Sequence, residues 1–317
     1  MNNNLKSVLQ SPAFNLSAAM IIVGSSVICG KVLTQEIPLF LASEIRFLLS
    51  TLLFIPFGIY NKKLLFIPRH DLLILSAMSF CGQVVFTILL LWGLRYTSGI
   101  NAGTLTSTTP FFMAIIAILL LNEKYGKVQI IALCMSLSSI MCLSYDSFID
   151  IANSNFDQTI GNLMVLGAVM GESCFLLIGK KLKTNISGIN QTAILSLLGV
   201  IICLPPAIAE SIHFPFHSLT YTDLLAMLYL GWIYTNLAYF CWFNGLKWTS
   251  GANAGIYTAL MPISASFFSL LLMNESINLY QGLALFLAIS SIIISTSWKR
   301  VADYGKFKKR DNQIQPS

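Results

Sequence analysis

One apolar stretch of this chain occurs twice. Residues 93–123 read GLRYTSGINAGTLTSTTPFFMAIIAILLLNE, and residues 245–275 read GLKWTSGANAGIYTALMPISASFFSLLLMNE. The two copies are identical at fourteen of thirty-one positions, among them Thr-Ser-Gly, Asn-Ala-Gly, one proline and the closing Asn-Glu. A self-match of this length across an apolar segment indicates a duplicated unit, and a period near half the chain length indicates two related halves.

The composition indicates that both halves lie in a membrane. Hydrophobic residues make up 56% of the chain and charged residues only 10%, whereas soluble domains carry about a quarter of charged residues. A bilayer core of about 30 Å requires about 20 apolar residues in each helix. We therefore predict an all-α integral membrane protein with ten transmembrane helices, at roughly 16–35, 37–60, 71–93, 99–121, 127–146, 160–179, 190–210, 222–245, 251–273 and 278–298.

The distribution of basic residues predicts the topology. With both termini in the cytoplasm, sixteen of the nineteen Lys and Arg residues lie inside, Lys31 and Arg95 lie outside, and Arg46 lies within a span. Five spans in each half is an odd number, so the second repeat enters the membrane inverted relative to the first. The predicted parts are a cytoplasmic N-terminus at 1–15, two five-helix repeats at 16–146 and 160–298, and a basic cytoplasmic tail at 299–317.

Other classes of site have weak support in the sequence. The seven cysteines show no paired spacing, so we expect small core residues and neither disulfides nor metal ligands. His213 and His217 flank Pro215, which denies them a shared helix face, so they are expected to be loop residues and no metal site is predicted. The net charge of +6 is spread over loop ends and the tail, and this pattern is not typical of a nucleic-acid-binding surface.

Glycine and proline recur at matched positions of the duplicated spans. Each copy has two glycines four residues apart, followed by a proline seven residues later. Such interruptions in corresponding spans of two halves are the best sequence indication of a transporter's substrate site. The alternative is that they only allow two kinked helices to pack closely. The residues predicted to form the kinks are Gly99, Gly103, Pro110, Gly251, Gly255 and Pro262.

Ionisable residues within the predicted spans are few, and each is costly in lipid unless it is paired or hydrated. Glu44 and Arg46 stand two positions apart and therefore point to different faces of one helix. Lys31 could reach Glu44, which would leave Arg46 to meet a carbonyl cluster or an anionic group. The alternatives are that Glu44 and Arg46 are structural pins between helices and that Lys31 is an anchor at the outer interface. Glu172 has no basic residue nearby in its own span. It is predicted to be a proton site or a counter-charge for the substrate, with a buried structural carboxyl as the alternative.

The span at 222–245 is unusually aromatic. Trp232, Asn236, Tyr239 and Phe243 recur with helical spacing, which predicts one face able to stack a planar or cationic substrate. Aromatic residues at span ends also form interfacial belts, which is the alternative for part of this set. Gln83 stands near the position of Asn236 in the first half, so both amides are predicted to be polar groups of a cavity.

The order of these features resembles the drug/metabolite transporter superfamily, in particular EamA-type carriers. The resemblance rests on Gly24-Ser25 with Lys31, Arg46 after the helix start at Pro38, the T-S-G-x-N-A-G turns, the two mid-span prolines, and Glu123 with Glu275. Many relatives carry Trp at the position of Val23. The resemblance implies a ten-helix bacterial inner-membrane carrier, and similar members move amino acids, nucleotide sugars, sugar phosphates, S-adenosylmethionine and drugs.

We therefore expect a secondary transporter of a small metabolite, an amino acid or a derivative in the first place, with S-adenosylmethionine-like compounds or drugs included. The alternatives are a lipid flippase or scramblase and, with less support, an integral membrane enzyme, for which the spans offer Glu172 without a His or Asp partner. The expected partners are the substrate, the bilayer and protons, without a cofactor. The predicted cavity residues are Glu172, Asn236, Gln83, Trp232, Tyr239, Lys31, Arg46, Thr106, Asn101 and Asn253.

Overall fold

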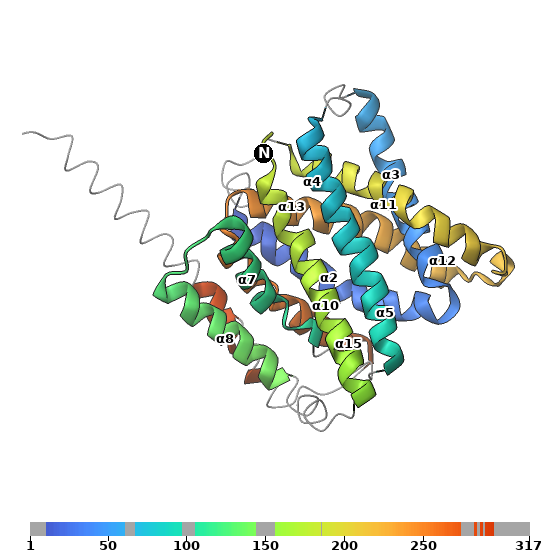
Figure 1. The fold of residues 1–317 in the computed structure, drawn as a ribbon. Coiled ribbons are helices and arrows are strands. Elements are labelled where there is room, and N and C mark those ends of the chain that lie inside the picture. The colour runs from blue at the N-terminus through green and yellow to red at the C-terminus, as the bar shows by residue number, and fades with distance from the viewer. Residues whose placement is uncertain are drawn as a thin grey trace, which may run out of the picture.

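The computed structural model describes residues 11–60, 67–96, 105–143, 156–184, 186–273, 282–283, 286–287 and 289–294. Within these ranges the chain is helical and contains no strand (Figure 1). The elements are α2 (Pro12–Glu36), α3 (Leu39–Tyr60), α4 (Arg69–Ser79), η2 (Phe80–Val85), α5 (Phe86–Tyr96), α7 (Thr109–Leu121), α8 (Lys127–Leu143), α10 (Phe156–Ile178), η3 (Gly179–Lys181), α11 (Gly188–Ser211), η4 (Phe216–Ser218), α12 (Tyr221–Leu228), η5 (Tyr229–Ala238), α13 (Tyr239–Lys247), α14 (Gly251–Tyr257) and α15 (Leu260–Met273).

Four continuous helices in the described part are long and apolar enough to cross a membrane. They cover Arg69–Leu90, Phe156–Lys181, Gly188–Ser211 and Tyr221–Lys247, and three shorter apolar helices accompany them. Large apolar side chains are exposed on these helices, as at Leu163, which is 62% exposed. Lipid tails are as apolar as leucine, so such surfaces are stable in a bilayer and unstable in water. The protein is therefore an α-helical, multi-pass membrane protein.

The helices of the two halves pack in matching pairs. α10 packs on α5 and α7, and its counterpart in the first half, α2, packs on η5, α13 and α15. α3 packs on α11, which is its equivalent in the second half, and α7 of the fourth predicted span packs on α14 of the ninth. Figure 1 shows α5 and α10 side by side in the middle of the molecule. Side chains from both halves, including Leu16, Met113 and Trp242, form one buried core.

The third and eighth predicted spans each contain a π-helical segment at a corresponding position. Residues 80–85 form η2, and the positions 152 residues later fall within η5. A π-helix bonds each amide to the carbonyl five residues back, so its turn is wider than that of an α-helix. Thr235 fits this geometry, because its hydroxyl donates to the carbonyl of Leu230 at 2.8 Å. These segments alter which side chains share a face.

The fourth and ninth predicted spans are broken, and this finding corrects the prediction of mid-span proline kinks. Regular α-helix is interrupted at residues 107–108 and 258–259, and α7 and α15 begin directly after the breaks. Pro110 and Pro262 therefore lie in the first turn of a new helix, where the missing amide hydrogen leaves no bond unmade. Thr109 and Thr258 donate to the carbonyls of Thr106 and Gly255 at 2.7 and 2.6 Å. Such bonds satisfy backbone groups at the breaks.

The glycines of the ninth span allow a close approach to the fourth span. A Cβ atom added at Gly251 would stand 3.3 Å from the Cβ of Ala117, and one added at Gly255 would stand 3.2 Å from the Cβ of Met113. Close packing of two helices, which is the alternative to a substrate site, therefore accounts for these two glycines. Gly99 and Gly103 lie outside the described residues.

Candidate functional site

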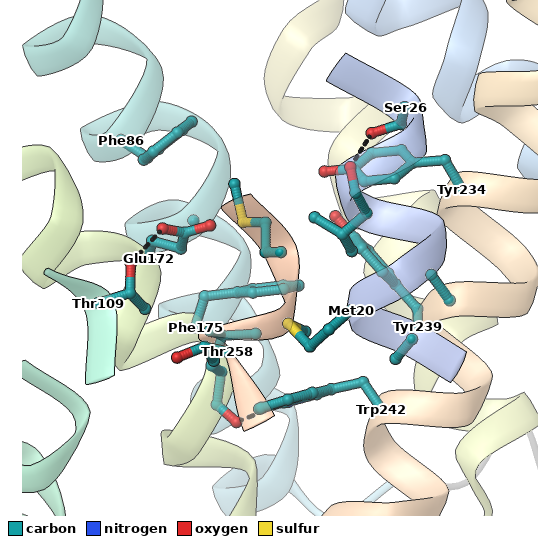
Figure 2. Close-up of a pocket in the computed structure, with 16 residues that line it drawn as sticks. Met20, Ser26, Phe86, Thr109, Glu172, Phe175, Tyr234, Tyr239, Trp242 and Thr258 are labelled. Carbon is teal, nitrogen blue, oxygen red and sulfur yellow. Dashed lines mark hydrogen bonds between the residues drawn. The ribbon is translucent and has the colours of Figure 1, made fainter. Parts of the chain in front are cut away.

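A cavity of about 180 Å³ lies between helices of both halves. Its walls come from α2 and α10, from the η2–α5 and η5–α13 segments, and from the two helix breaks (Figure 2). Each wall in one half thus has its equivalent in the other. The lining residues are Ala19, Met20, Val23, Ser26, Gly82, Phe86, Thr109, Glu172, Phe175, Leu176, Tyr234, Ala238, Tyr239, Trp242, Thr258 and Met261.

Glu172 is the one charged side chain among these lining residues. Its Oε2 accepts a hydrogen bond from the Thr109 hydroxyl at 3.3 Å. Within the described part of the chain, no basic side chain lies within 4.0 Å of its carboxylate. An unpaired carboxylate is costly in an apolar surrounding, so this site favours a bound proton or a cationic group.

Aromatic rings form the wall of the cavity on the η5–α13 side. The ring of Tyr239 lies 5.3 Å from that of Phe175 and 6.1 Å from that of Tyr234, measured between centroids. The indole of Trp242 donates to the carbonyl of Leu176 at 3.0 Å and joins α13 to α10. Aromatic faces attract cations, so the walls and the carboxylate favour the same kind of ligand.

Arg46 does not line this cavity. Its guanidinium carbon lies 4.3 Å from the ring centroid of Phe47 and 5.3 Å from that of Tyr234, so it lies on the Tyr234 ring that contributes to the cavity wall. Glu44 is 4% exposed, and neither of its carboxylate oxygens has a hydrogen-bond partner among the described residues. The side chain of Lys31 lies outside the described part, so the predicted approach of Lys31 to Glu44 stays a prediction.

Gln83 and Asn236 are buried between helices and are not among the lining residues. The Gln83 amide accepts from Ser79 at 2.8 Å and donates to the carbonyl of Leu195 at 3.3 Å. Asn236 accepts from the hydroxyl of Ser50 and donates to the Ser50 carbonyl at 3.4 Å. Each amide therefore links a π-helical segment to a helix of the other half.

The predicted face of Trp232, Asn236, Tyr239 and Phe243 does not form. Trp232 is 44% exposed and donates to the carbonyl of Leu49 at 3.3 Å, Asn236 is buried, and of the four only Tyr239 lines the cavity. The reason is η5, because a segment with bonds to the fifth preceding residue does not keep the spacing of 3.6 residues per turn on which the prediction rested.

The remaining predicted cavity residues lie elsewhere. The Thr106 carbonyl accepts from Thr109 at the break, and Thr106 itself does not line the cavity. Asn253 is buried in the first turn of α14, where its backbone N–H donates to the hydroxyl oxygen of Ser250 at 3.2 Å. Asn101 lies outside the described residues. Among these predictions, the structure brings Glu172 and Tyr239 together in one cavity.

Several lining residues are absent from the predicted set. Thr109 begins α7 directly after one helix break and Thr258 lies in the other, Tyr234 and Trp242 belong to the aromatic span, and Phe175 follows Glu172 by three positions. A signal for the two threonines was present in the sequence, since each stands within a few residues of the repeated proline. Phe175 stands near Glu172 on the same helix, because residues three apart are neighbours on a helix surface.

Comparison with known proteins gives a consistent result over nearly the whole chain. The profile of the EamA-like transporter family matches residues 11–145 and again residues 159–297. The protein described as uncharacterized transporter YetK of Bacillus subtilis (strain 168) is 32% identical over 295 residues, which cover 91% of this chain and 88% of YetK. An uncharacterized transporter of Clostridium kluyveri is 26% identical over 288 residues, covering 88% of this chain and 91% of that protein.

A solved crystal structure is similar in fold. Its TM-score is 0.73, and the match covers 90% of this chain and 97% of that one at 15% identity. At this identity the likeness supports the fold alone. The double match of the family profile and the identity with YetK carry the assignment. The chain is a member of the EamA-like transporter family and hence a membrane transporter.

Proposed function

We propose that this transporter is a secondary carrier of a small solute with an ammonium group, an amino acid or a close derivative in the first place. The observation that carries the proposal is Glu172, which is the single charged side chain among the described residues that line the cavity. An ammonium group placed there would pair with the carboxylate in a cavity that aromatic rings, among them Tyr239, also line.

The proposal includes ten transmembrane helices in two inverted repeats, at 16–146 and 160–298, in the bacterial inner membrane with both termini in the cytoplasm. α10 packs on helices of the first half, and α2 packs on helices of the second half, which supports two related halves. The basic loops support the orientation. Alternating access would then proceed by rocking of one repeat against the other about a site at their interface.

The geometry of the cavity supports a small substrate. Its volume of about 180 Å³ is below the roughly 300–1,000 Å³ of sites that enclose drug-sized ligands. S-adenosylmethionine-like compounds and drugs would require an enlarged cavity, whereas an amino acid requires less change. The broken helices at Thr109 and Thr258 supply the interruptions that transporter sites typically use.

Counterflow in proteoliposomes tests this function. Vesicles preloaded with one amino acid should accumulate the same labelled compound, and the analogue that keeps the carboxylate but lacks the ammonium group should neither enter nor compete. Equal transport of an amino acid and its deaminated analogue would contradict the proposed role of the ammonium group, while transport of neither by folded protein would contradict the substrate class.

Fusion reporters test the proposed topology. A reporter after Arg310 should be cytoplasmic and one inserted at Asn153 should be external, because the segment 146–157 contains no Lys or Arg and the tail is basic. Periplasmic and cytoplasmic reporter activities in whole cells provide the measurement. Both reporters on one side would contradict the inverted repeat.

Replacement of Pro110 or Pro262 by Ala should reduce transport more than stability. Each proline lies in the first turn after a helix break, and alanine favours continuation of the helix through that break. We expect the free energy of unfolding to change by less than about 1 kcal/mol, because a residue in the first helical turn has no intrahelical partner for its amide hydrogen, and alanine therefore adds no backbone hydrogen bond. Pro38→Ala, at the start of α3 and away from the cavity, is the matched control. A large loss of melting temperature with unchanged transport per folded molecule would assign both prolines to packing.

A further inference from the structure

A second cavity, of about 300 Å³, opens where α10, α11 and α13 end or begin at one edge of the bundle. The described residues that line it include three lysines, Lys180, Lys183 and Lys247, and no acidic residue. Its floor is apolar, formed in part by Phe243 and Leu246. The cavity therefore combines an apolar floor with a basic rim.

The charges of the rim are compensated only in part. The ammonium of Lys180 lies 3.1 Å from Glu123 Oε1 and donates to the carbonyl of Thr249 at 2.5 Å. In the described ranges, neither Lys183 nor Lys247 has a carboxylate within 4.0 Å. Two cations without a carboxylate partner among the described residues thus line the cavity, and one of them, Lys247, lies 5.4 Å from the ring centroid of Trp248. Two positive charges beside an apolar floor favour an anion attached to an apolar body.

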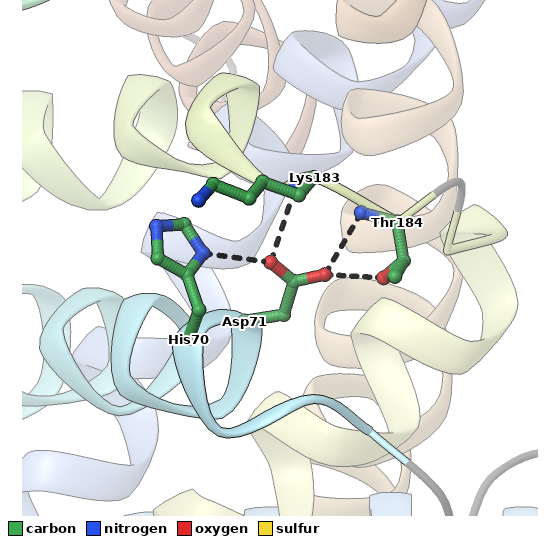
Figure 3. A network of polar contacts seen from close by, with 4 residues as sticks. All are labelled: His70, Asp71, Lys183 and Thr184. Carbon is green, nitrogen blue, oxygen red and sulfur yellow. Dashed lines mark hydrogen bonds and ion pairs between the residues drawn. The ribbon is translucent and has the colours of Figure 1, made fainter.

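The wall that carries Lys183 is held in place by a buried carboxylate. Asp71 is fully buried at the start of α4 and accepts from the backbone amides of Lys183 and Thr184 at 3.0 and 2.9 Å. The Thr184 hydroxyl and the His70 ring also bond to it (Figure 3). The segment that carries Lys183 is therefore joined to α4. The bond to Asp71 uses the backbone amide of Lys183 and not its ammonium group.

A buried amide in the cavity has a weak partner. Gln191 is 6% exposed and lines the cavity, and its Nε2 is paired with the thioether sulfur of Met78 at 4.0 Å. Sulfur is a weak acceptor, so an oxygen ligand in the cavity would be a better partner for this amide. A built-in donor at the floor complements the two cations at the rim.

We propose that this cavity binds the phosphate group of an anionic membrane lipid. Lysine ammonium groups bind phosphate as point charges, and basic pockets between membrane helices suit anionic head groups. Trp248, 61% exposed beside Lys247, fits an aromatic residue at the level of the head groups. This end of the bundle carries the loops predicted to be cytoplasmic, where anionic lipids create a negative surface potential.

The test compares lipids on purified, delipidated protein in a neutral detergent. Phosphatidylglycerol should raise the melting temperature more than phosphatidylcholine, and the apparent affinity for phosphatidylglycerol should fall about fivefold for each of Lys183→Gln and Lys247→Gln, hence about 25-fold in the double variant. Lys181→Gln, an exposed lysine of the same loop that does not line the cavity, is the matched control and should keep the wild-type affinity.

Two outcomes would overturn the proposal. Equal stabilisation by inorganic phosphate, with no added effect of phosphatidylglycerol, would reassign the site to a soluble anion. A preference for phosphatidylglycerol that the double variant retains in full would place the lipid elsewhere. Because the readouts are melting temperature and lipid affinity, neither result depends on the substrate of the carrier.

Discussion

Replacement of Glu172 by Gln is expected to weaken binding of an ammonium-bearing substrate by about ten- to a hundredfold. The carboxylate is the single charged group among the described residues that line the cavity of about 180 Å³, and a hydrogen bond to a charged group contributes about 1.5–3 kcal/mol. Gln keeps the size of the side chain and can still accept a hydrogen bond from Thr109, so folding should change little. Binding is measured by thermal shift on purified protein, and transport by counterflow.

The same variant distinguishes the two roles considered for Glu172. If it is instead a proton site, substrate exchange should survive in Glu172→Gln, while the dependence of net transport on a pH gradient should disappear. Asp157→Asn is the matched control, because Asp157 lies in the first turn of the same helix α10 and is exposed. Binding, exchange and pH dependence all at wild-type levels would identify Glu172 as a structural carboxyl.

The parts of the site that could be predicted from sequence are those whose signal is local. Glu172 stands out because a carboxylate is rare inside an apolar span, and Tyr239 because its span is dense in aromatic rings. The helix breaks have a repeated proline beside them, and the prediction erred only in placing a kink where a new helix begins. The membership in a transporter family likewise follows from motifs that persist in both halves.

The parts that could not be predicted depend on helix geometry and on contacts between the halves. The sequence carries no pattern that predicts the π-helical segment η5. The prediction therefore assumed 3.6 residues per turn and placed Trp232 on the same helix face as Tyr239. Gln83 and Asn236 were recognised as unusual polar residues, but a sequence does not tell an amide that lines a cavity from one that bonds to a neighbouring helix. Their partners, Leu195 and Ser50, lie 112 and 186 positions away.

The hydrogen bonds of Gln83 and Asn236 also connect the two halves of the chain. The hydroxyls of Ser50 in α3 and Ser196 in α11 lie 2.6 Å apart, directly beside the bonds of Gln83 and Asn236. Polar groups in the apolar interior bond to one another because no water replaces them. This cluster joins α3, α11 and both π-helical segments, and a rocking motion of the repeats would have to keep or exchange these bonds.

Replacement of Asp71 by Ala is expected to lower the free energy of unfolding by about 3 kcal/mol or more. Asp71 accepts from two backbone amides and one hydroxyl of residues 183–184, and a hydrogen bond to a charged group contributes about 1.5–3 kcal/mol. Asp71→Asn should lose less, because the amide keeps one acceptor oxygen. Thermal unfolding in detergent, followed by intrinsic fluorescence, provides the measurement.

The repeat supplies the matched control, Asp223, which stands 152 positions after Asp71. Both residues are the third of their helix, but their surroundings differ. Thr220 precedes α12 and forms a reciprocal capping box with Asp223, whereas Pro68 precedes α4 and has neither an amide hydrogen nor a hydroxyl to offer. The carboxylate of Asp71 is therefore free to bond to the other half of the chain. Asp223→Ala should consequently remove one local cap and lower the melting temperature by clearly less than Asp71→Ala. Equal losses would mean that both carboxylates act only on their own helix, and that the segment carrying Lys183 is held by other contacts.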